Sequence, residues 1–365
     1  MNYTNYFINM TYRQMPRIIF FIHAVIITAL CSGCSSIGYY AQMIGGHIEI
    51  HSQTQPIESV INNPETEDKL KHKLLLIQEA KEFAVNNLDL PQNNSYSDYV
   101  DLGRKYVLWS VTAAPKLSLK PYQSCFPIVG CMSYKTFFSK DDANKFANSL
   151  KQQGYDTYVA GIAAFSSLGW FDDPIINTML SWRDTRLAGL IFHELTHQKI
   201  YIANDTTFNE SIAVAVELEG IKKWLKHSGK EDKLDTFIEN QKRHQQFLDL
   251  VLNTRQQLKS LYQSQFSEYK KSAEKKKLFA ELIKDYETLK QSWKGYSGYD
   301  RWFNTDLNNA KLALLSTYTQ YVPAFTQLLH NHNGDFANFF IAAKDISKME
   351  KEKRNNFLNS LPLKK

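Results

Sequence analysis

The stretch Phe192-His193-Glu194-Leu195-Thr196-His197 decides how the rest of this chain is interpreted. Apolar residues before and within it recur at three- and four-residue spacing, which predicts an amphipathic helix with one buried face. Positions i and i+4 of a helix lie on the same side, so His193 and His197 would direct two imidazoles at one point, as a tetrahedral zinc ion requires. Glu194 borders that point and is placed to take a proton from a metal-bound water. The alternative is a chance pair of histidines on a surface helix.

A third ligand is expected from the next helical run, residues 208–217. Glu210 lies thirteen residues after His197, which leaves room for a loop that reverses the chain and lets two antiparallel helices face each other across the metal. Glu210 would complete a His2Glu set and leave the fourth zinc position for water. Glu217 lies two turns later on the same face. It is the competing ligand, and otherwise a partner that orients a histidine or binds a substrate amine.

The two motifs together resemble a known class of enzymes. His193-Glu194-x-x-His197 followed by Asn209-Glu210-x-x-Ala213-x-x-x-Glu217 is similar to the gluzincin metallopeptidases. The closer resemblance is to a family of bacterial lipoproteins described as "putative aminopeptidase". Its further marks in this chain are Gly33 to Gln42, Cys125 to Cys131, Leu168 to Pro174 and Asn308-Asn309-Ala310. The resemblance implies a peptidase of the cell envelope with one zinc ion, a peptide as substrate and, by the family's label, aminopeptidase activity.

The expected fold is α+β and mostly helical, with a zincin-like metallopeptidase core, a small sheet and a C-terminal helical bundle. Helices are predicted over 57–63, 69–87 and 141–153, and strands over 106–114 and 155–165. Residues 212–294 show the pattern of long amphipathic helices, which predicts a helical hairpin or bundle. The expected division is a signal peptide (1–33), a tether (34–60), a catalytic region (61–225) and a helical region packing against the cleft (226–365).

The first residues have the features of a targeting segment. Arg13 and Arg17 precede an apolar run over 18–30, which is short for a membrane span and suits a signal peptide. Small residues then precede Cys34, as in a lipoprotein signal, so Cys34 is predicted to carry a lipid anchor. The enzyme would face the periplasm, with the outer membrane preferred because Ser35 is not aspartate. The alternative is an ordinary cleaved secretory signal.

Composition limits the partners of this chain. The net charge is +6, and no basic stripe with interleaved aromatic residues is present, so no nucleic-acid partner is predicted. The sequence does not identify a protein partner. Cys125 and Cys131 flank a turn-forming segment with proline and glycine, which predicts a disulfide in an oxidising compartment. The alternative is a pair of buried free thiols.

Residues beside the predicted cleft are candidates for substrate binding. The strand over 155–165 would be an edge strand to which a peptide adds, and the small side chains of Ala163 and Ala164 would let its backbone approach. The alternative is an ordinary core strand. Asp172 and Asp173 would bind the substrate α-amine, or else form a turn and cap a helix that begins at Ile175.

The remaining catalytic candidates would act on the transition state. Tyr318 and Tyr201 are candidates for the hydrogen-bond donor to the oxyanion, and Asn309 for holding the substrate backbone. The alternative for Tyr318 is a buried helix residue with a satisfied hydroxyl. In the resulting mechanism Glu194 accepts a proton from the attacking water and delivers it to the leaving amine. Two other classes stay open, an amidase of cell-wall peptides and a zinc-containing scaffold lipoprotein without turnover.

Overall fold

The computed structural model describes residues 38–126, 130–164, 166–167, 171–313, 315 and 320–361. The predicted signal peptide, Cys34, residues 168–170 and Tyr318 lie outside these residues. Within the described ranges, no helix combines the length and apolar character needed to cross a membrane.

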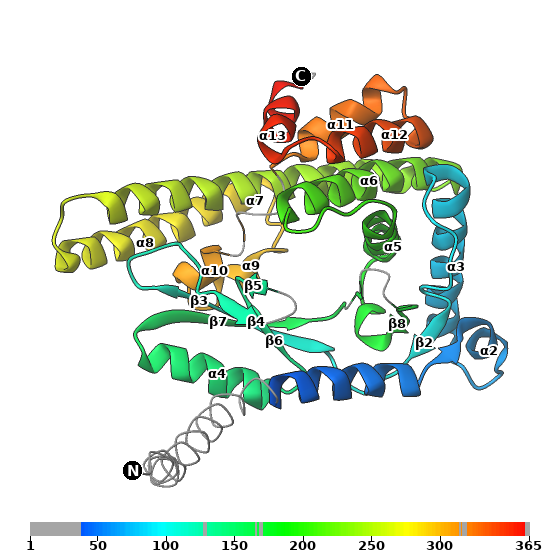
Figure 1. The fold of residues 1–365 in the computed structure, drawn as a ribbon, viewed down its shortest axis with the longest axis horizontal. Helices are drawn as coiled ribbons and strands as arrows, with labels where there is room; N and C mark the ends of the chain where they lie inside the picture. Colours follow the sequence, from blue (N-terminus) through cyan, green and yellow to red (C-terminus); the bar gives the residue numbers. More distant parts are fainter. Residues whose placement is uncertain are drawn as a thin grey trace, which may run out of the picture.

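The fold is α+β and mostly helical with small sheets, as predicted (Figure 1). The helices are α2 (Ile57–Asn62), α3 (Asp68–Leu88), α4 (Lys140–Gln152), α5 (Asp184–Lys199), α6 (Thr206–His227), α7 (Asp232–Gln263), α8 (Glu268–Ser292), α9 (Asp300–Phe303), α10 (Asn309–Ala313), α11 (Val322–Asn331), α12 (Phe336–Ser347) and α13 (Lys351–Ser360), with a 3-10 turn at Asn177–Met179. The strands are β1 (Gln55–Pro56), β2 (Asp98–Val100), β3 (Leu108–Pro115), β4 (Ser124–Phe126), β5 (Gly130–Met132), β6 (Lys135–Phe137), β7 (Tyr155–Ile162) and β8 (Ile175–Ile176).

The longest strands form a sheet in the order β6-β3-β7. β3 and β7 pair antiparallel from Leu108 opposite Ile162 to Pro115 opposite Tyr155. Both are rich in β-branched, aromatic and small residues, which suit a pleated and half-buried surface. α4 begins after Ser139, whose side chain accepts a hydrogen bond from the backbone of the first turn and caps it. The predicted strand and helix of this region are therefore confirmed.

The main core surrounds α5 and α6. Figure 1 shows α6 lying between α5 on one side and α11 on the other. Phe208, Ile212 and Trp224 of α6 are fully buried and share one apolar cluster with residues of α3, α5, α11 and α12. Burial on several sides holds the two helices at a defined separation, and these are the helices that carry the site.

The α7–α8 hairpin has an apolar core of its own. Phe247, Val251 and Leu258 of α7 pack with Leu282 and Tyr286 of α8, and the cluster continues into α9 and α10. This confirms the hairpin predicted for residues 212–294. Near the C-terminus, residues 351–360 form the helix α13.

The start of the described chain differs from the expected tether. Residues 38–52 are helical and Ile50 is fully buried. The side chain of Gln42 accepts a hydrogen bond from the backbone N–H of Phe138, 3.2 Å away. This part of the segment is therefore a helix that contacts the fold through Ile50 and Gln42, although Ile44 and Ile48 are exposed. The division of the chain into domains stays a prediction.

Candidate metal centre

The two histidines lie on α5, next to residues of the helix that are fully buried. In α5 the apolar residues Leu187, Ile191 and Leu195 are fully buried, as their spacing predicts. His193 and His197 project from the same side of the helix because they are one turn apart. The side chain of His193 is 16% exposed and that of His197 is 3% exposed, so both rings are largely shielded from water.

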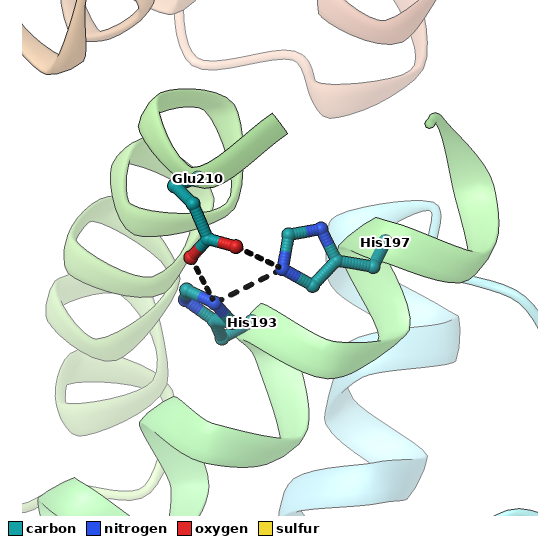
Figure 2. A group of neighbouring side chains, drawn as sticks. All are labelled: His193, His197 and Glu210. Atoms are coloured by element: carbon teal, nitrogen blue, oxygen red, sulfur yellow. Dashed lines mark hydrogen bonds and ion pairs between the residues drawn. The ribbon is translucent and has the colours of Figure 1, made fainter. Parts of the chain in front are cut away.

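Glu210 completes the group from the neighbouring helix. Figure 2 shows the two imidazoles of α5 and the carboxylate of α6 turned toward one another. The Nε2 atoms of His193 and His197 are 3.1 Å apart. Glu210 places Oε2 3.4 Å from Nε2 of His193 and Oε1 3.6 Å from Nε2 of His197. Within the described chain, these residues are the one group of at least three His, Cys, Asp or Glu side chains close enough to share an ion.

The distances and donors suit zinc. Tetrahedral bonds of roughly 2.0–2.1 Å place neighbouring ligand atoms about 3.3 Å apart. The separations of 3.1, 3.4 and 3.6 Å, of which the last two are to different oxygens of Glu210, lie near that value. Two imidazole nitrogens and a carboxylate oxygen are also the donors of many catalytic zinc sites. The residues present therefore fit a zinc ion with one position left for a further ligand.

The electrostatics of the cluster favour one cation. Burial opposes the charge on His193, but hydrogen bonds to Glu210 and Glu217 outweigh it and raise the pKa of His193. Burial, followed by the neighbouring His193, lowers the pKa of His197. A single positive charge is thus stabilised between the rings, and a second proton is not.

Glu217 supports His193 from behind. Its Oε2 lies 3.2 Å from Nδ1 of His193, on the opposite side of the ring from Glu210. A carboxylate at this position accepts a hydrogen bond from Nδ1–H. The lone pair of the ring is then on Nε2, which points toward the metal position. Glu210 therefore lies at Nε2 of His193, on the side of the His–Glu group, and Glu217 lies at Nδ1 on the other side of the ring.

Gly189 makes room for Glu217. A Cβ atom at Gly189 would lie 2.8 Å from Cδ1 of Ile221 and 3.1 Å from both Cγ and Oε1 of Glu217. Any larger residue would push against the side chain that orients His193. Sequence reasoning missed this position, although a glycine inside a predicted helix is a signal of close packing.

Glu194 lies in a protected position beside the cluster. It accepts a hydrogen bond from the hydroxyl of Ser166, which follows the end of β7. Burial raises the pKa of Glu194, while His193 opposes that rise. A carboxylate with a raised pKa is suited to accept a proton and release it again. Ser166 was not predicted, because it lies 28 residues before Glu194 and belongs to no motif.

The loop between α5 and α6 is held by side chains that flank Glu210. The amide of Asn209 donates to the carbonyl of Ile202 and accepts from its N–H, both at 2.8 Å. Asp205 caps α6 by accepting from the N–H of Phe208 at 3.2 Å. Its other oxygen pairs with Arg354 of α13, and both side chains are 5% exposed. Sequence reasoning identified neither Asp205 nor Arg354.

A family model described as "putative aminopeptidase" matches residues 38–358, a range that contains α5 and α6. The chain belongs to this family. Comparisons with curated proteins and with solved structures give no match. The family description indicates a peptidase, and a peptidase acts on peptide substrates.

One predicted oxyanion donor lies beside the metal cluster. The ring of Tyr201 is 6.3 Å from that of His197, and its side chain is 52% exposed. Tyr134, which sequence reasoning missed, is half-buried. Burial raises the pKa of Tyr134, and the negative charge of Glu210 raises it further. Tyr96, which is buried, also lies near the group, because its pKa is raised by burial and then by the charge of Glu194.

Asn309 does not face the cleft, so its predicted role in substrate binding is wrong. Its side chain is fully buried. Its amide hydrogens point at the carbonyls of Pro115, Lys116 and Ser118, at 2.9 to 3.0 Å. Its oxygen accepts from the hydroxyl of Tyr262 at 2.8 Å. Asn309 therefore joins the loop after β3 to α7, and its hydrogen-bonding capacity is used within the fold.

The two adjacent aspartates have separate positions. Asp173 is fully buried, and its Oδ2 accepts from the N–H and the hydroxyl of Ser167 at 2.7 and 3.0 Å. It thereby closes a short loop, and the residues that follow form β8, so the predicted helix cap at Ile175 is wrong. Its burial also keeps a substrate amine away. Asp172 is exposed.

β7 is an edge strand of its sheet, as predicted, but its outer side is partly covered. The carbonyl of Thr157 accepts from Asn308 at 3.0 Å. The carbonyl of Ala163 accepts from the hydroxyl of Thr178 at 2.5 Å. Ala164 packs against the main core. A peptide adding to this strand would have only its middle available.

The predicted disulfide is confirmed. Cys125 of β4 is bonded to Cys131 of β5, and the two residues lie opposite each other in the antiparallel pair. The bridge closes the hairpin that leads to Tyr134.

Proposed function

We propose that this protein is a zinc-dependent peptidase of the cell envelope, and an aminopeptidase as the label of its family suggests. The observation that carries the proposal is the convergence of His193, His197 and Glu210 at zinc-like separations, with Glu194 beside them. A scaffold needs the ligands alone, whereas a hydrolase also needs a base, and this site has one. The packing of α5 against α6 supports a zincin-like core.

The residues divide the work of hydrolysis. His193, His197 and Glu210 would hold one zinc ion, which supplies Lewis acidity and lowers the pKa of a water that it binds. The carboxylate of Glu194 accepts a proton from the attacking water and passes it to the nitrogen of the leaving amine. Ser166 orients that carboxylate through its hydroxyl. Glu217 holds the proton of His193 at Nδ1.

The decisive test separates metal binding from turnover. Glu194→Gln should keep one zinc ion per chain, measured by mass spectrometry, and should lose hydrolysis by roughly 10²–10⁴-fold. Glu82→Gln, on the exposed side of α3, is the matched control and should behave as the wild type. His197→Ala should lose the metal. Undiminished turnover in Glu194→Gln, or undiminished zinc in His197→Ala, would remove these residues from the mechanism.

The substrate is tested with the same protein. A panel of peptides with free amines, peptides with blocked amines and muropeptides would be incubated with the enzyme. Cleavage confined to free amines supports an aminopeptidase. Cleavage of blocked peptides makes it an endopeptidase, and cleavage of muropeptides alone makes it a cell-wall amidase.

The envelope location rests on Cys34 and is tested by itself. Cys34→Ser should abolish labelling with a clickable palmitate analogue and should move the protein from the membrane fraction to the soluble fraction. Cys31→Ser is the control and should leave both unchanged. A membrane-bound, labelled Cys34→Ser variant would contradict lipidation at this cysteine.

A further inference from the structure

A cavity lies far from the candidate metal centre, between the loop that follows β3 and the C-terminal half of α7. Its volume is about 760 Å³. Lys120 of the loop and Arg255 and Lys259 of α7 line it, and none of the described residues around it is acidic. Leucines and a proline supply an apolar wall, at Leu117, Leu119, Pro121 and Leu252.

Arg255 is partly removed from water without a countercharge. Its Nε is buried and has no hydrogen-bond partner in the described part of the chain. Burial lowers the pKa of Arg255, and no neighbouring carboxylate opposes the effect. The stretches outside the described ranges contain no aspartate or glutamate that could supply one. A buried polar group without a partner costs stability, so a bound anion would relieve that cost.

Other cations of the same hairpin are compensated. Lys275 pairs with Asp156 at 2.6 Å, and Lys290 pairs with Asp300 at 2.8 Å. Lys271 donates to the carbonyl of Tyr262 at 2.9 Å. These three lysines are thus compensated within the fold, whereas in the described part of the chain no ion pair involves Arg255, Lys259 or Lys120.

The wall of the cavity is preformed. Asn309 binds three carbonyls of the 115–118 segment, and Tyr262, which lines the cavity, donates its hydroxyl to Asn309. The Asn308-Asn309-Ala310 motif therefore holds the loop that carries Lys120 at a set distance from α7. Lys120 and Lys259 are exposed side chains, but the backbone that carries them is held in place, which lowers the entropy lost when a ligand binds.

The cavity is separate from the metal centre. It adjoins the end of the sheet where Pro115 lies opposite Tyr155, whereas Ser166 and Glu194 lie beyond the other end of β7. Eight residues of strand span about 26 Å. A group bound in the cavity would not take part in the metal-centred reaction.

We propose that this cavity is a binding site for a phosphate group. One guanidinium and two ammonium groups match a dianion with several acceptor oxygens, and arginine binds such groups with two parallel hydrogen bonds. The apolar wall would accept a hydrocarbon substituent, as in a phosphate monoester headgroup with acyl chains. The site is independent of the proposed zinc chemistry.

The test is calorimetric titration of the full chain at about 150 mM salt, where nonspecific surface attraction is screened. The probes are inorganic phosphate and monomeric dihexanoyl phosphatidic acid. Binding of both means that the phosphate group suffices, and binding of phosphatidic acid alone means that the apolar wall is also needed. Either result supports the proposal if Arg255→Gln and Lys259→Gln each weaken binding at least about tenfold.

Lys276→Gln is the matched control, because Lys276 is an exposed lysine of α8 outside the cavity. It should leave affinity within about twofold. Thermal unfolding of each variant shows whether it is folded, and Lys120→Gln gives a third test if Arg255→Gln is not. The proposal is overturned if neither probe binds below about 10 mM, or if Lys276→Gln weakens binding as much as the cavity variants do.

Discussion

Replacing Gly189 with alanine tests whether the packing of α5 against α6 sets the affinity for zinc. The new Cβ would lie 3.1 Å from Cγ and Oε1 of Glu217, closer than an ordinary contact, and 2.8 Å from Cδ1 of Ile221. Ile221 can move the end of its side chain. Glu217 can move only by lengthening its 3.2 Å contact with Nδ1 of His193. We therefore expect His193 to lose its orienting partner.

The magnitude follows from opposing effects. Alanine is better than glycine inside a helix by about 1 kcal/mol, and overpacking a core costs about 1–3 kcal/mol. The free energy of unfolding should therefore fall by only about 0–2 kcal/mol. Loss of a carboxylate that orients a metal-binding histidine lowers metal affinity about 10–100-fold. The variant should thus remain folded while binding zinc much more weakly.

The assay is competition for zinc with a chromophoric chelator, together with urea unfolding of each protein. Gly220→Ala is the matched control, because its Cβ would meet Leu88 and Phe192 at 2.9 Å and does not touch Glu217. It should lose similar stability and keep wild-type zinc affinity. Gly189→Ala combined with Ile221→Val should recover stability but not affinity.

Two outcomes contradict this reasoning. If Gly189→Ala binds zinc as tightly as the wild type, Glu217 does not act through the position that Gly189 leaves open. If Gly220→Ala weakens zinc binding equally, the loss comes from general loosening of the two helices. Either result would mean that Glu217 lies near His193 but does not determine the affinity for zinc.

Three further predictions concern the support of the site and the core. Glu217→Ala should lower zinc affinity about 10–100-fold in the same chelator assay. Arg354→Met leaves the buried carboxylate of Asp205 without its cation, so the free energy of unfolding in urea should fall by about 3–5 kcal/mol. Adding Asp205→Asn should reduce this loss. An unchanged urea midpoint in Arg354→Met would refute the prediction. Burial lowers the pKa of Lys311 to about 8 from 10.5. Between these two pKa values the unfolded state binds more protons than the folded state. The free energy of unfolding of the wild type should therefore rise with pH above about 8, by up to about 1.4 kcal/mol per pH unit relative to Lys311→Met. Parallel pH profiles of the two proteins would exclude this.

Local spacing was enough to predict the elements that carry the site. The i, i+4 spacing places His193 and His197 on one face whatever the rest of the chain does. The apolar periods of α5, α6 and the α7–α8 hairpin are also properties of neighbouring residues. The disulfide was predictable for the same reason, since its cysteines are six residues apart.

The tertiary structure decided what depends on residues distant in the sequence. Sequence reasoning left Glu210 and Glu217 in competition, and only the packing of α6 on α5 puts them on opposite sides of His193. The sequence predicted Asn309 to bind substrate, whereas in the structure its side chain hydrogen-bonds to groups up to 194 residues away in the chain. The apolar period of a helix predicts which of its faces is buried, but it does not predict which residues pack against that face. Hydrogen-bond partners depend on those packing neighbours, so only the tertiary structure determines them.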